Sequence, residues 1–381
     1  MSWPTVQINQ VNQLQGETNE IERVVLFVGL GSGKEATTGQ AMPVNTQSDF
    51  DALLGADDST LKSTVKAAMR NAGQNWSGYV FVLPSDLTAA DAEKAWASAV
   101  KTAQQVASVE GVVLTLDASK TTIQTAATLR AELIAQFGRW VWFVLAVGGP
   151  GKDEDWTKYL TRLSTLQNGA AVPAVQLSPR LWGNEPGVLV GRLCNRAVTI
   201  ADSPARVQTG ALLDMGNADL PVDGKGNVLE LATLQALEKQ RYSVPMWYPD
   251  YDGYYWSDGR TLDVEGGDYQ AIENLRIVDK AARRVRLQAI AKIADRSLNS
   301  TPGSIAAHQA YFAKTLREMS RSSQINGVTF PGEVKAPQDG DVVITWRSKS
   351  QVEIYITVRT YECPKGITVS LLLDQSVESA A

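Results

Sequence analysis

The sequence predicts an α/β fold in which a three-layer, mostly parallel sheet domain precedes an α+β C-terminal domain, with extended terminal arms on both sides. In the first half, short apolar runs alternate with longer segments of helical periodicity. In the second half, long helical patterns are followed by alternating strands. Strands that alternate with helices are typical of parallel sheets, whereas grouped helices and strands indicate α+β structure.

Strands of the first domain are predicted where apolar residues run without interruption, at 24–30, 79–84, 111–117, 140–147 and 173–178. Helices are predicted between them, each with Ser, Thr or Asp near its start, at 59–72, 89–108, 122–137 and 156–166. Strands that are apolar throughout are covered on both faces. Right-handed helical crossovers that supply this cover produce a parallel sheet.

The second half predicts helices at 187–198 and 228–241, and a hairpin over the aromatic segment 247–256, where Asp252 and Gly253 favour a turn. Beyond the hairpin, two long helices and three strands are predicted, at 268–298, 305–321, 341–347, 352–362 and 367–374. The chain therefore divides into an N-terminal arm, an α/β domain, an α+β domain and a C-terminal strand with its arm, at 1–20, 21–240, 241–365 and 366–381.

The composition is that of a globular protein, because 44% of the 381 residues are hydrophobic and 20% are charged. Lys and Arg number 36 against 41 Asp and Glu, which gives a net charge of −5. Neutralising phosphates requires a cationic surplus, so nucleic acid is not an expected partner. The N-terminus lacks a basic segment followed by an apolar run, and the longest apolar stretch, 141–147, is too short for a membrane span. We expect a cytosolic product without membrane insertion.

No catalytic, cofactor-binding or metal-binding site is predicted. His308 is the only histidine, which excludes mechanisms and metal sites that need two imidazoles. Cys194 and Cys363 lie far apart and form no CxxC pair, so a thiolate zinc site is not indicated. Neither a Gly-x-Ser-x-Gly nor a His-Glu-x-x-His motif is present. These features favour a protein that is not an enzyme, with an unrecognised α/β hydrolase or transferase as one alternative.

Two loops approach ligand-binding motifs without satisfying them. The segment GLGSGKE (29–35) follows Val28, where a phosphate-binding loop needs glycine, and ends in Glu35, where it needs a hydroxyl. The segment from Asp219 to Glu230 resembles a calcium loop but has Pro221 at the third position. We interpret the first as a strand-to-loop exit and the second as a turn that caps the next helix.

The aromatic segment 247–256 is open to two interpretations. Its six Trp and Tyr side chains could stack on sugars, which would make the chain a sugar-binding, adhesin-like module. Alternatively, such a density of aromatics anchors a hairpin or fills a protein interface, where Tyr and Trp are enriched.

Positive charge is concentrated in the first long helix. Between residues 276 and 296 there are seven basic and two acidic residues, a local charge of +5. Apolar residues at three- and four-residue spacing predict the buried stripe of this helix. The basic residues beside the stripe form either a solvated face or a patch that docks on an acidic partner: Arg276, Lys280, Arg283 and Arg284. The second long helix is a rival, through Lys314, Arg317 and Arg321.

Both termini are predicted to be short extended segments outside the domains. Residues 5–13 alternate in character, and their apolar members are Val6, Ile8 and Val11. The predicted C-terminal strand contains Val369, Leu371 and Leu373. A strand at a terminus satisfies its backbone only by pairing with a sheet edge, in its own subunit or in a neighbour.

The second half, at about 185–375, resembles the contractile tail sheath proteins of myophages and R-type tailocins. The resemblance is carried by GVLVGRLCNRAVTIADSPARVQTGAL (187–212), YYWSDGRTL (254–262) and YQAIENLRIVDKAARRV (269–285). A helix opened by TPGS, the segment INGVTF and a final set of strands follow in order.

The resemblance implies a structural subunit that polymerises into a helical sheath around an inner tail tube and contracts to drive the tube through a target envelope. It implies that the α/β domain lies outside, that the C-terminal domain faces the tube, and that the basic helix touches it. The N-terminal arm residues would pair in one neighbour, and the C-terminal strand would complete a shared sheet. Baseplate and tail terminator proteins would be further partners, with assembly in the host cytoplasm before incorporation into a particle tail.

Overall fold

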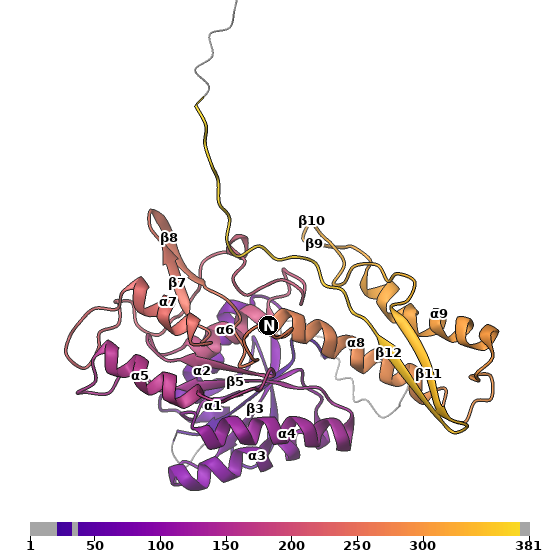
Figure 1. Ribbon diagram of the computed structural model, residues 1–381. Coiled ribbons are helices and arrows are strands. Elements are labelled where there is room, and N and C mark those ends of the chain that lie inside the picture. Colours follow the sequence, from indigo (N-terminus) through magenta and orange to yellow (C-terminus); the bar gives the residue numbers. More distant parts are fainter. Residues whose placement is uncertain (1–20, 33–36, 374–381) are drawn as a thin grey trace, which may run out of the picture.

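A six-stranded sheet forms the centre of the first part of the chain (Figure 1). In the computed structural model, the described residues are 21–32 and 37–373. The strand order is β2 (Ala41–Asn45), β3 (Ser77–Leu83), β1 (Val25–Leu30), β4 (Gly111–Leu114), β5 (Trp142–Val147) and β6 (Val175–Pro179). All neighbouring pairs are parallel except β2 with β3. The predicted mostly parallel sheet is confirmed.

The apolar runs form strands because both of their faces are covered. Every residue of β4 and β5 is buried, and Val25 to Val28 of β1 are 0% exposed. The edge strand β2 is absent from the prediction because it lacks a continuous apolar run and contains Pro43, a residue that an edge strand tolerates.

Helices cover the two faces of the sheet. On one face α2 (Thr60–Ala72) packs against α6 (Glu185–Cys194), and on the other α3 (Ala89–Val106) lies beside α4 (Lys120–Phe137). Near the β6 side, α5 (Trp156–Gln167) contacts α7 (Leu231–Lys239). Two short elements complete the domain: α1 (Phe50–Leu54) and a 3-10 turn, η1 (Val207–Thr209). The expected helix caps are present, since side-chain oxygens accept first-turn N–H groups at Ser59, Ser119 and Asp155.

The rest of the chain starts with a projecting hairpin, β7 (Pro245–Tyr248) and β8 (Tyr251–Trp256), and the long helix α8 (Ile272–Ile290) (Figure 1). The elements that follow are α9 (Pro302–Met319), β9 (Ser323–Ile325), β10 (Val328–Phe330), β11 (Val342–Ser348) and β12 (Gln351–Ile356). β11 and β12 form a two-stranded antiparallel sheet that packs on α9. This part agrees with the predicted α+β region.

The main hydrophobic core continues beyond residue 240, the predicted end of the α/β domain. Tyr242, Trp256, Leu262 and Leu275 all belong to the core of the sheet domain. The hairpin and the first turn of α8 are therefore packed on that domain. Further along, two smaller clusters form around Leu316 and Phe312.

Candidate functional site

The basic residues of α8 do not form the exposed face that their spacing predicts. Arg276 donates two hydrogen bonds to the carboxylate of Glu110, from Nε to Oε1 at 2.6 Å and from Nη2 to Oε2 at 2.8 Å. Both side chains are 1% exposed. Glu110 directly precedes β4, so this ion pair joins α8 to the centre of the sheet.

The pair is held in its charged form. Burial by itself raises the pKa of the Glu110 carboxyl, but the charge and hydrogen bonds of Arg276, with further contributions from Arg283 and the Arg23 amide, lower it to about 2. Burial disfavours the charged guanidinium of Arg276, yet the charge of Glu110 raises the pKa of this group. Each partner therefore stabilises the ionised state of the other.

Two further candidates are also paired within the subunit. Lys280 Nζ lies 2.7 Å from Glu333 Oε1, and Arg283 Nη2 lies 2.7 Å from Glu22 Oε1. The predicted docking face is corrected accordingly: Arg276, Lys280 and Arg283 are buried and ion-paired. The physical reason is that their carboxylate partners come from distant parts of the chain, which helical periodicity does not reveal.

Exposed positive charge lies further along α8. Arg284 is half-buried and Arg286 is exposed, and neither forms an ion pair with a described residue. Beside them, three aliphatic side chains are exposed by 41%, 51% and 77%: Leu287, Ile290 and Ile293. We call Arg286, Leu287, Ile290, Ile293 and Arg296 the α8 end patch. On α9, Lys314 is partnered by Glu318 at 3.8 Å, and Arg317 donates to the Ala310 carbonyl at 2.5 Å.

The C-terminal segment is extended and carries apolar side chains that the described residues leave exposed. The exposed fractions are 80%, 74%, 92%, 95% and 81% for Ile367, Val369, Leu371, Leu372 and Leu373. The predicted strand at 367–374 therefore forms no strand over its described residues, because no sheet edge in the described part of the chain pairs with it. Figure 1 shows this segment leaving the body of the molecule. Val6, Ile8 and Val11 lie outside the described residues.

The β11–β12 sheet offers edges to which a strand could add. Val342 and Ile344 face the α9 side and are 5% and 7% exposed, whereas Val343 and Tyr355 on the opposite face are 45% and 54% exposed. Within the described part of the chain, neither β11 nor β12 has a second strand partner. An isolated two-stranded sheet is marginally stable in water, so added strands would stabilise it.

The aromatic hairpin is mostly an anchor. Trp256 is 0% exposed and donates from Nε1 to Ser243 Oγ at 2.7 Å. Tyr254 packs edge-on against Trp182, with ring centroids 5.1 Å apart. Near the tip, Tyr248 and Tyr251 remain 39% and 55% exposed. The hairpin is therefore held to the sheet domain by its own aromatic residues, as the second interpretation of the sequence expects.

The two loops that resemble a calcium site and a phosphate-binding loop show no ligand site in their described residues. The Asp223 carboxylate accepts hydrogen bonds from the backbone amides of Lys225, Asn227 and Trp156 at 2.8, 2.9 and 3.1 Å. These hydrogen bonds hold the turn that follows Asp223. In the described part of the chain, no three His, Cys, Asp or Glu side chains are arranged to hold a metal ion. Residues 33–36 of the glycine-containing loop after β1 lie outside the described residues.

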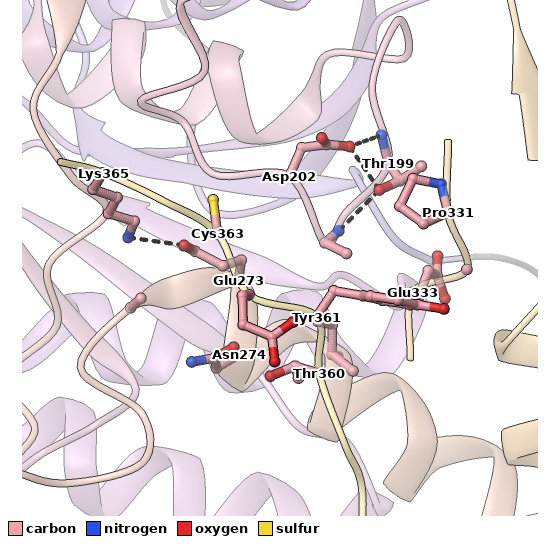
Figure 2. A pocket seen from close by; sticks show the side chains of 15 residues that line it. Thr199, Asp202, Glu273, Asn274, Pro331, Glu333, Thr360, Tyr361, Cys363 and Lys365 are labelled. Atoms are coloured by element: carbon pink, nitrogen blue, oxygen red, sulfur yellow. Dashed lines mark hydrogen bonds and ion pairs between the residues drawn. The ribbon is translucent and has the colours of Figure 1, made fainter. Parts of the chain in front are cut away.

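A cleft of about 330 Å³ lies where the sheet domain, α8 and residues 360–365 meet (Figure 2). Its lining includes Asp202, Glu273, Glu333, Cys363 and Lys365. The acidic groups are already engaged, since Lys365 lies 2.9 Å from Glu273 and Asp202 accepts hydrogen bonds from Thr199. The cleft therefore lies at the contact between segments of one chain, and its acidic side chains are used in contacts within that chain. Among the described residues, no helix combines the length and apolar character needed to span a membrane.

Comparison with known proteins supports a structural class. The fold resembles the PVC sheath of an extracellular contractile injection system in its contracted state, with a TM-score of 0.63 and 15% identity over 98% of each chain. The contracted helical sheath of the anti-feeding prophage gives a TM-score of 0.59 at 14% identity, over 98% of this chain and 100% of that one. A sheath tail protein of Desulfitobacterium hafniense gives 0.55 at 10% identity, over 93% and 96%. This is the fold of contractile sheath subunits.

The family follows from closer sequence relationships. The model described as DUF2586, N-terminal domain, matches residues 3–260, and that described as DUF2586, C-terminal domain, matches residues 268–376. A protein of Haemophilus phage HP1 (strain HP1c1), named "Putative tail sheath protein", is 54% identical over 378 residues, which is 98% of each chain. The chain belongs to the DUF2586 family of tail sheath proteins.

Proposed function

We propose that this chain is the structural subunit of a contractile phage-tail sheath, which polymerises into a helical sleeve around an inner tube and shortens to drive the tube through a target envelope. The tail sheath relative at 54% identity and the fold of contracted sheaths support this function. The observation that carries the assembly mechanism is the exposed apolar C-terminal segment, which has no partner strand among the described residues.

Strand donation would connect the subunits. The segment around Val369, Leu371 and Leu373 would add to an edge of the β11–β12 sheet of a neighbouring copy, where backbone N–H and C=O groups are available. The N-terminal arm, through Val6, Ile8 and Val11, would pair in another neighbour. A contact in which one surface binds a different surface of the next copy produces an open helical assembly when the rotation between copies does not close into a ring.

The tube contact would be made by the C-terminal domain, with the sheet domain outside. Because Arg276, Lys280 and Arg283 are engaged within the subunit, the contact would use Arg284 and the α8 end patch instead. An acidic tube surface would complement this patch. Exposed ion pairs contribute about 0 to 1 kcal/mol each, which is weak enough for the sheath to detach and slide.

Contraction would move the subunits as rigid bodies linked by their arms. The buried Glu110–Arg276 pair would make α8 move with the sheet domain. Free energy would be released through new contacts between subunits. The subunit would catalyse no reaction, would require no cofactor, and would work with tube, baseplate and tail terminator proteins after assembly in the host cytoplasm.

Deletion of residues 366–381 tests this function. The truncated subunit is expected to fold, since residues 366–373 are not part of the described core, but to form no sleeves in negative-stain electron micrographs. The full-length protein, prepared identically, is the control. Sleeves of normal length from the truncated subunit would rule out C-terminal strand donation.

A further inference from the structure

The nine residues after β12, 357–365, form a strap that crosses from the C-terminal sheet to the sheet domain (Figure 1). At its start, the Thr357 amide donates to the Asp341 carbonyl at 2.8 Å. Further along, the Lys335 amide donates to the Arg359 carbonyl at 2.7 Å, and Arg359 Nη2 lies 2.5 Å from Asp341 Oδ1. The strap is thus fixed to the C-terminal domain over its first residues.

Near the far end, the exposed Glu362 forms an ion pair with Lys335 of the C-terminal domain, and Lys365 makes the ion pairs with the sheet domain and α8. Lys365 Nζ lies 2.9 Å from Glu273 Oε1 and also contacts Asp258 Oδ1 (Figure 2 shows the first of these contacts). Glu273 belongs to the first turn of α8, and Asp258 lies just after β8. The side chains of Asp258 and Glu273 are 15% and 5% exposed, and that of Lys365 is 27% exposed. One ammonium group therefore ties the strap to the hairpin region and to α8.

Contact with the body ends at this lysine. Gly366 has no atom within 4 Å of the position where a Cβ would lie, and Ile367 is 80% exposed. Residues 366–373 form no hydrogen bond or ion pair with the rest of the described chain. Lys365 is accordingly the last point at which the described chain is fixed before the apolar C-terminal segment.

The two carboxylates depend on the lysine. Burial raises the pKa of the Glu273 carboxyl, Lys365 opposes this effect, and the neighbouring Asp258 adds to it. The second oxygen of Glu273, Oε2, is buried and has no hydrogen-bond partner. Without Lys365, two carboxylates of like charge would face each other in a poorly solvated place, which is unfavourable.

We propose that Lys365, clasped by Asp258 and Glu273, is a positioning residue that sets the direction in which the C-terminal segment leaves the subunit. The strap up to residue 365 then moves with the rigid body. The backbone flexibility that lets the C-terminal segment stay attached to a neighbour while the subunits move begins at Gly366. This inference rests on the proposed donation of the C-terminal segment to a neighbour.

Replacement of Lys365 by Met tests the clasp in the full-length subunit. Lys349→Met is the control, because Lys349 is exposed and forms no ion pair with a described residue. Cleavage after Glu362 by a glutamyl endopeptidase reports opening of the strap. K365M is expected to be cleaved about tenfold faster than the wild type, with faster amide exchange over 358–365, because the strap opens locally while the core remains folded. Lys365→Arg, which keeps the charge, is expected to restore most of the protection.

If K365M folds poorly, the triple variant D258N/E273Q/K365M removes the repulsion between the carboxylates while leaving the strap unclasped. Wild-type cleavage and exchange rates in this triple variant, or in a folded K365M, would overturn the proposal. Loosened straps with fewer or shorter sleeves would support it, whereas loosened straps with normal sleeves would contradict the positioning role. If the 366–381 deletion assembles normally, the strand-donation function fails, and the protease result still decides whether Lys365 holds the strap.

Discussion

Arg276 and Glu110 are the most deeply buried ion pair among the described residues, with both side chains 1% exposed. Removing two charges from water is costly, and the cost is offset here by two short hydrogen bonds and by the stacking of the guanidinium over Trp142 at 5.9 Å. In the sequence, Arg276 is only one of several basic residues on the same face of a predicted helix. Its role depends on Glu110, which lies 166 positions away in the chain.

Replacing Glu110 by Gln leaves Arg276 buried with no charged partner. We expect a loss of about 3 to 5 kcal/mol in the free energy of unfolding, measured by urea denaturation at neutral pH. Glu132→Gln is the control, since Glu132 forms an exposed pair with Lys101 whose loss costs less than about 1 kcal/mol. Equal losses of unfolding free energy in the two variants would mean that the buried pair stabilises the fold no more than an exposed pair does.

The same pair predicts an acid dependence. Because the pKa of Glu110 is lowered from 4.5 to about 2 in the folded state, its stabilising contribution is complete above the unfolded value and is lost as the pH falls toward 2. The difference in unfolding free energy between the wild type and E110Q should therefore shrink below about pH 4.5. A difference that stays constant from about pH 5 to about pH 3 would contradict this assignment.

At the scale of elements, α2 and α6 pack unusually closely. A Cβ on Gly187 would lie 2.1 Å from the Thr64 carbonyl oxygen, and one on Gly191 would lie 2.5 Å from the Ala68 carbonyl oxygen. Both glycines belong to the segment GVLVG, which opens the stretch that resembles sheath proteins. Small residues in this helix let the two backbones approach while the helices cover one face of the sheet.

Gly191→Ala is expected to force α2 and α6 apart. Overpacking of this kind costs about 1 to 3 kcal/mol, which thermal or urea unfolding of the isolated subunit would detect. Gly303→Ala in the first turn of α9 is the matched control, because no atom lies within 4 Å of its Cβ position. The control should be neutral or slightly stabilising, since alanine restricts the unfolded chain more than glycine does. A neutral G191A would show that the helices can separate freely.

At the scale of the whole molecule, the subunit combines a rigid body with apolar surface that its own fold leaves uncovered. The rigid body includes the sheet domain and α8, joined by buried ion pairs and by the hydrophobic core. The uncovered surface lies in the C-terminal segment and in the α8 end patch. This arrangement suits a sheath subunit, whose work is done by contacts with copies of itself and, as proposed above, with a tube.

Charge reversal in the α8 end patch tests the tube contact. Arg286→Glu is expected to reduce binding to tubes of the same particle, with the larger effect at low salt because exposed charge interactions are screened. Co-sedimentation at two ionic strengths measures this effect. Lys152→Glu makes the same charge change on an exposed loop of the sheet domain and should bind normally. Equal binding by both variants would mean that the tube contact does not involve Arg286.

The sequence by itself determined the parallel strands, the capped helices and the class of protein, because continuous apolar runs, helical periodicity and local motifs are properties of neighbouring residues. Only the tertiary structure decided which charges are exposed, where the sheet-domain core ends, and whether residues 367–373 pair with a described strand. Arg276, Lys280 and Arg283 meet carboxylates from remote segments, and Tyr242 and Trp256 enter a core that began at Val25. Such pairings are long-range, and a strand forms only where a sheet edge supplies its partner, which the described residues do not offer to residues 367–373.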